Sequence, residues 1–65
     1  MPIVRIELYS GRTAEQKTNC ARDIVEAVSR NLGVAAEATQ VVFYDVERSD
    51  WLTGGKIPPP AVKKE

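Results

Sequence analysis

The 65-residue sequence predicts an α/β fold made of one β-α-β unit with parallel strands, and two observations support this prediction. Two short segments, residues 2–9 and 40–46, are rich in the β-branched and aromatic side chains that favour strands. Between them, residues 14–32 repeat apolar side chains with the period of a helix. A strand, a helix and a second strand in this order form a unit with parallel strands and a right-handed crossover. Residues 1–65 are therefore expected to form a single domain.

The first expected strand covers residues 2–9 and alternates between two faces. A proline at the first position is tolerated there, because that position need not donate a hydrogen bond to the sheet. The two faces consist of Val4, Ile6 and Leu8 on one side and Ile3, Arg5, Glu7 and Tyr9 on the other.

The expected helix has a recognisable start and end. Thr13 precedes Gln16 by three residues, which is the spacing of a capping box, so the helix should begin near Ala14. Gly33 follows the apolar period and is suited to a left-handed cap at the end of the helix. Cys20 lies on the apolar face and is expected to be a small buried side chain. The apolar face comprises Ala14, Cys20, Ala21, Ile24, Val25, Ala27, Val28 and Leu32.

The second expected strand, residues 40–46, is apolar on both faces over most of its length and is expected to be buried on both sides. Two strands do not form an independently stable sheet, so pairing with a second copy of the chain into a larger sheet is expected. Beyond this strand, Gly54-Gly55 predicts a turn. The three prolines at residues 58–60 favour an extended tail, which either packs on a neighbouring chain or frays.

Composition excludes several classes of function. Nine Lys and Arg balance nine Asp and Glu, so nothing marks a nucleic-acid or membrane-surface partner. With no His and one Cys, no zinc, iron–sulfur or other metal ligand set is recognisable, and no disulfide within the chain is expected. No apolar run approaches the length of a membrane span, and no secretion signal is recognisable. A cytoplasmic oligomer is the resulting expectation.

The start of the chain offers the most unusual chemistry. The sequence has no His for a catalytic triad and no Gly-rich phosphate-binding loop. Removal of Met1, which is common before proline, leaves Pro2 with a free secondary amine. An α-amino group has a pKa near 7.7–8.0, and desolvation or a nearby cation lowers that pKa toward neutrality, where a general base is most useful. The same amine can instead attack a carbonyl or an activated multiple bond.

Several motifs resemble those of the 4-oxalocrotonate tautomerase family. They are the Met-Pro start, Gly11-Arg12 followed by a Thr-x-Glu-Gln-Lys helix start, the strand VVFYDV, and Trp51 ahead of Gly54-Gly55. The resemblance covers nearly the whole chain. It implies a homohexamer, a trimer of dimers with joint four-stranded sheets, in which each site combines residues of two or more chains. It also implies a reaction without cofactors.

The resemblance assigns roles to four residues. Pro2 is the general base that moves a proton on a small 2-oxo or 2-hydroxydienoate acid. Arg12 anchors a substrate carboxylate, and Trp51, in place of the commoner Phe, lines the site and excludes water. Gln40 stands where the family has a second arginine, and a neutral amide can bond a substrate oxygen but not neutralise its charge. Other groups able to compensate are Arg5, Arg48, Tyr9 and Tyr44.

Simpler interpretations of the same residues stay open. Pro2 can merely start a strand, Arg12 can be a solvated loop residue, and Trp51 can be a packing or interface residue. A second enzymatic hypothesis is hydration, dehalogenation or decarboxylation of a three-carbon acid, with Asp45, Glu47 or Asp50 orienting water. A third hypothesis is a non-catalytic oligomeric module. Retention of Met1 favours that third hypothesis, because the nitrogen of Pro2 is then an amide.

Overall fold

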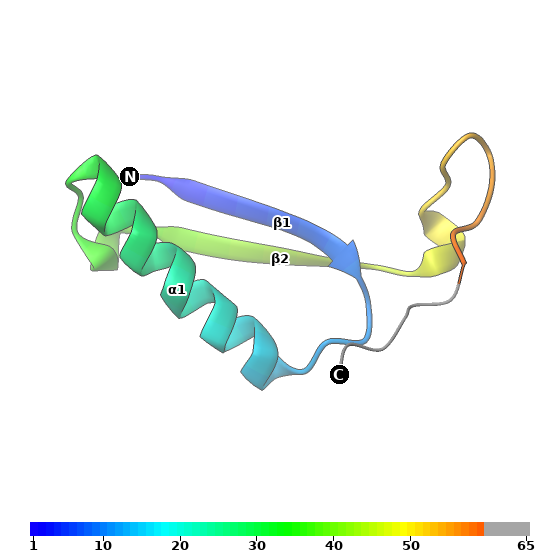
Figure 1. Cartoon of the computed structure of the whole chain (residues 1–65), viewed down its shortest axis with the longest axis horizontal. Coiled ribbons are helices and arrows are strands. Elements are labelled where there is room, and N and C mark those ends of the chain that lie inside the picture. Colours follow the sequence, from blue (N-terminus) through cyan, green and yellow to red (C-terminus); the bar gives the residue numbers. More distant parts are fainter. Residues whose placement is uncertain (60–65) are drawn as a thin grey trace.

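The computed structural model describes residues 1–59 and contains one helix across one face of a two-stranded sheet (Figure 1). The elements are β1 (Ile3–Tyr9), α1 (Ala14–Leu32) and β2 (Gln40–Val46). The strands are parallel, with Ile3 opposite Gln40 and Tyr9 opposite Val46. The predicted β-α-β unit with parallel strands is confirmed, and β1 begins one residue later than expected.

The predicted caps of α1 are both present. Thr13 Oγ1 accepts a hydrogen bond from the Gln16 backbone N–H (3.1 Å), and Gln16 Oε1 accepts one from the Thr13 backbone N–H (2.9 Å). At the other end, Gly33 adopts the left-handed conformation (φ +69°), which favours glycine, and its N–H donates to the Ser29 carbonyl (3.0 Å). Local sequence therefore determines both ends of this helix.

Two short 3₁₀ helices were not predicted, η1 (Ala36–Ala38) and η2 (Arg48–Asp50). Each has three residues, too few to show a periodic pattern. After η2, Thr53 and Lys56 pair across the predicted Gly54-Gly55 turn, which is confirmed. Pro58 and Pro59 are non-helical, as expected, whereas Pro60 and the rest of the expected tail lie outside the described residues.

The helix covers the β1 face that carries Val4, Ile6 and Leu8, and the ion pair between Lys17 Nζ and Asp45 Oδ2 (2.5 Å) ties α1 to β2 on that side. In a parallel sheet, paired residues share a face, so Phe43 lies beside Ile6 under the helix. The opposite face has no covering element among the described residues. Several side chains on it are exposed, including Ile3 (51%) and Tyr44 (43%).

No described residue is fully buried in the single chain. The expectation that residues 40–46 are covered on both faces is wrong for this single chain, because one helix covers one face. Cys20 is also exposed rather than buried, since a two-stranded sheet is too narrow to cover the whole apolar sector of α1. A chain of this size without a buried core needs additional contacts for stability. Among residues 1–59, no helix is long and apolar enough to cross a membrane.

Candidate active site

A hollow of about 450 Å³ lies where β1 ends and the segment after β2 begins. It brings together two of the predicted site residues, Arg12 and Trp51. It also contains Arg48, one of several compensating donors that the sequence could not place. The lining residues are Leu8, Tyr9, Ser10, Gly11, Arg12, Arg48 and Trp51.

Arg12 reaches this hollow because of the turn between β1 and α1. The backbone N–H of Ser10 donates to the Val46 carbonyl (3.0 Å), which holds the chain against β2 one residue beyond the strand. Gly11 then adopts a positive φ of 122°, a conformation that side chains disfavour, and redirects the chain. Arg12 follows directly and precedes the capping residue Thr13, so both of its neighbours are conformationally fixed.

An aromatic and cationic stack forms one wall of the hollow. The rings of Tyr9 and Trp51 are 4.7 Å apart between centroids and meet edge to face at 67°. The guanidinium carbon of Arg48 lies 4.2 Å from the Tyr9 ring centroid, which is a cation–π distance. Arg48 Nη1 also donates a hydrogen bond to the Pro59 carbonyl (2.6 Å). The 3₁₀ turn of η2 places these groups together, because Trp51 N–H donates to the Arg48 carbonyl (3.1 Å).

The charge at this hollow is positive and uncompensated within the described residues. The ion pair found among the described residues joins Lys17 and Asp45 away from the hollow, and neither Arg12 nor Arg48 forms one with a described acidic residue. A guanidinium presents several N–H donors in a plane that matches a carboxylate. Two such groups beside an aromatic wall suit a small organic anion.

Pro2 and Gln40 lie together at the opposite end of the sheet. The backbone N–H of Gln40 donates to the Pro2 carbonyl (3.0 Å), and the N-terminus in Figure 1 is at the end away from η2. The seven residues of β1 separate this end from Arg12 by roughly 20 Å at the usual rise of a strand. One chain therefore does not unite Pro2 and Gln40 with Arg12 and Trp51.

The acidic residues of the hydration hypothesis lie outside this hollow. Asp45 is paired with Lys17 on the helix side of the sheet. Glu47 and Asp50 are exposed on the segment that contains η2, and neither lines the hollow. Within residues 1–59, no cluster of three metal-ligating side chains is present.

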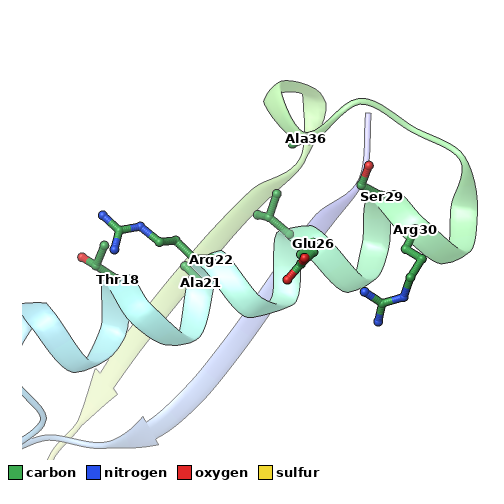
Figure 2. A pocket seen from close by; sticks show the side chains of 8 residues that line it. Thr18, Ala21, Arg22, Glu26, Ser29, Arg30 and Ala36 are labelled. Carbon is green, nitrogen blue, oxygen red and sulfur yellow. The ribbon is translucent and has the colours of Figure 1, made fainter.

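A larger hollow, of about 580 Å³, lies on the flank of α1 and holds none of the predicted site residues. Figure 2 shows its side chains projecting from successive turns of the helix, with Ala36 of η1 beside them. Its charged members belong to the helix. The lining residues are Thr18, Ala21, Arg22, Val25, Glu26, Ser29, Arg30 and Ala36.

The fold and the arginine-lined hollow define a class of small β-α-β proteins suited to binding carboxylates. The family model of the tautomerase enzymes matches residues 2–59. A probable tautomerase of Lactiplantibacillus plantarum is 40% identical over 57 residues, which cover 88% of this chain and 89% of that protein. This chain belongs to the 4-oxalocrotonate tautomerase family of tautomerase enzymes.

Solved structures of the same family have the same fold. A 4-oxalocrotonate tautomerase homologue superimposes with a TM-score of 0.81 and 35% identity, covering 88% of this chain and 90% of the other. A heterohexamer 4-oxalocrotonate tautomerase from Chloroflexus aurantiacus gives a TM-score of 0.77 and 29% identity, covering 85% of this chain and 89% of the other.

Proposed function

We propose that this protein is a cofactor-free tautomerase that moves a proton on a small 2-oxo or 2-hydroxydienoate acid, with Pro2 as the general base. The observation that carries this proposal is the family match, which begins at Pro2 and includes the residues of the hollow. Met1 is followed by a proline, before which the initiator methionine is commonly removed, as the mechanism requires. Removal of Met1 converts the Pro2 nitrogen from an amide into a basic secondary amine.

In the proposed reaction, one end of the sheet binds the substrate and the other end transfers the proton. Arg12 binds a substrate carboxylate through a charge-assisted, bidentate contact and orients the acid. The neutral amine of Pro2 then takes a proton from one position of the substrate and returns it to another, so the enzyme ends in its starting state. Trp51 excludes water from the reacting atoms. Gln40, next to Pro2, donates an amide N–H to a substrate oxygen.

The separation of Pro2 from Arg12 leads us to propose that each site is shared by two chains. Each strand of the two-stranded sheet has one free edge. When a two-fold axis pairs such an edge with its own copy, the paired strands run antiparallel, so the start of one strand lies beside the end of the other. This pairing makes a joint four-stranded sheet and brings Pro2 of one chain toward Arg12 of its partner.

A homohexamer of three such dimers is the assembly we propose. The open face of the sheet and the flank of α1 shown in Figure 2 are surfaces for further copies, because the described residues leave both uncovered. Light scattering should give the mass of six chains, and intact mass spectrometry of the same sample should give one chain species. A second chain species would replace the homohexamer with a mixed assembly.

The function is tested by phenylenolpyruvate ketonisation with Pro2→Ala and Arg12→Ala, alongside intact mass analysis of the N-terminus. We expect a natural chain without Met1, and a loss of about 10²-fold or more in kcat/KM for Pro2→Ala, the usual contribution of a general base. Lys56→Gln, on the turn after η2 and outside the hollow, is the control and should keep the wild-type rate. Unchanged rates in both site variants, or Met1 retained on most molecules, would remove the proposal.

A further inference from the structure

We propose that Arg5 and Glu7 form reciprocal ion pairs across the free edge of β1, so that this edge selects a second copy of the same chain as its partner. The inference rests on the proposed function, in which a site needs two chains. Both side chains are exposed on the open face of the sheet, and neither forms an ion pair among residues 1–59. Their neighbours on β2, Val42 and Tyr44, are uncharged. The described part of the chain thus supplies neither side chain with an opposite charge.

The backbone of β1 leaves a regular row of groups at its free edge. The Pro2 carbonyl accepts a hydrogen bond from the Gln40 N–H at 3.0 Å, and the Ser10 N–H donates to the Val46 carbonyl at 3.0 Å. The segment aligned with β2 therefore covers residues 2–10. In a parallel pair, alternate residues direct both the N–H and the C=O to the same neighbouring strand. Residues at even positions face β2, and those that face the free edge are Ile3, Arg5, Glu7 and Tyr9.

The charges and the backbone favour the same register of a two-fold pairing. Directly opposite residues share a face, so the axis passes beside one residue of β1, which then faces its own copy. An axis beside Ile6 places Arg5 opposite Glu7 of the partner subunit, in both directions, and pairs all four residues of the free edge. An axis beside Arg5 or Glu7 places like charges opposite each other, which is destabilising, and leaves one of the four unpaired. Registers farther from Ile6 leave more of them unpaired.

The same register completes the proposed site. It places Pro2 opposite Ser10 of the partner subunit, and Ser10 lines the hollow that contains Arg12. Within one chain, by contrast, roughly 20 Å separate Pro2 from Arg12. A different chain without this order of charges leaves Arg5 or Glu7 unpaired at the contact, so the two residues determine which chain is accepted as well as the register.

Charge reversal tests the pairing, with the dimers detected by native mass spectrometry over a dilution series. Arg5→Glu and Glu7→Arg each place like charges opposite each other twice in a dimer, so each variant should dissociate at a protein concentration about 10-fold or more above that of wild type. Co-expression of the two variants should give mixed dimers in excess of the roughly half that random pairing produces, because their charges are then opposite at both positions.

Two controls separate this effect from a general effect of charge. The doubly reversed chain, Arg5→Glu with Glu7→Arg, keeps the complementarity and should assemble as wild type does. Lys56→Glu, on the turn after η2, makes the same change of charge outside β1 and should also assemble as wild type does.

Several results would overturn the pairing. If Arg5 faces its own copy, Arg5→Glu exchanges one like-charged contact for another, so unchanged dissociation of the single variants contradicts the proposed register. A random share of mixed dimers, or none, contradicts the selection, even where neither single variant folds alone. Assembly is measured without substrate, so a protein inactive on phenylenolpyruvate that meets these expectations loses the tautomerase function and keeps the pairing. An active enzyme that fails them keeps the function alone.

Discussion

The two ends of the sheet differ in the charge and the packing of their side chains. At the end with Pro2 and Gln40, the contact that joins the strands is a backbone hydrogen bond, and the side chains there carry no charge. At the other end, two arginines lie in one hollow and stacked aromatic rings hold one of them. One end thus offers a candidate reactive group and the other a candidate anion site. A chain with such complementary ends is suited to meet a second copy in the antiparallel sense.

The strongest test of this comparison asks whether Pro2 and Arg12 of one site come from different chains. Pro2→Ala and Arg12→Ala, each expected to lose most activity alone, are co-expressed and purified as mixed oligomers. If a site takes Pro2 from one chain and Arg12 from another, random pairing restores about a quarter of the wild-type activity. Phenylenolpyruvate ketonisation measures the result, and separately purified variants mixed without subunit exchange are the control. Mixed oligomers as inactive as the single variants would place both residues of each site on one chain.

Replacing one polar side chain at each end compares how much each end contributes to kcat/KM. Arg12→Ala removes a charge-assisted contact and should lower kcat/KM about 10- to 100-fold, whereas Gln40→Ala removes a neutral hydrogen bond and should lower it about 2- to 10-fold. The Arg12 effect should appear mainly in KM, since the carboxylate is bound before and during proton transfer. Assembly measured by light scattering should be unchanged in both variants. A larger loss for Gln40→Ala would reverse the assignment of the binding end.

The sequence predicted the elements whose determinants are local. The capping box at Thr13 and the glycine cap at Gly33 set the ends of α1, and both signals involve residues within four positions of each other. The parallel strands followed from the connecting helix, because a strand-helix-strand order leaves few other topologies. These parts of the fold depend on short-range rules, which a single sequence contains.

The parts that the sequence did not predict depend on contacts between distant residues. From the sequence, Arg48 was one of several possible donors. Its position in the structure depends on contacts with Tyr9 and Pro59, which are far from one another in sequence. Burial of Cys20 and of both faces of β2 was expected from hydrophobic pattern alone. A pattern records which side chains avoid water but not which chain covers them, so it does not distinguish burial within one copy from burial against another.

The helix cap next to Arg12 provides a smaller effect, on stability rather than rate. Thr13→Ala removes a hydrogen bond at the start of α1 and should lower the free energy of unfolding by about 1 kcal/mol. Urea unfolding at one fixed protein concentration measures this, because the stability of an oligomer depends on concentration. Asn19→Ala, on the same helix but outside the cap, is the control and should change stability by less than about half as much. If both variants change stability equally, the cap makes no special contribution to holding the turn at Arg12.

The ion pair between Lys17 and Asp45 should give the smallest effect, since it belongs to neither end of the sheet. Its side chains are 23% and 44% exposed, so water screens the attraction and Asp45→Asn should cost less than about 1 kcal/mol in urea unfolding. Phenylenolpyruvate ketonisation should stay within about twofold of wild type, because Asp45 does not line the hollow with Arg12. The same variant also tests the hydration hypothesis as far as it assigns the orientation of water to Asp45 rather than to Glu47 or Asp50. If wild-type enzyme converts a halo-acrylate and Asp45→Asn abolishes that conversion while stability is retained, this carboxylate orients water, and the ion pair seen here is the resting state of a catalytic group.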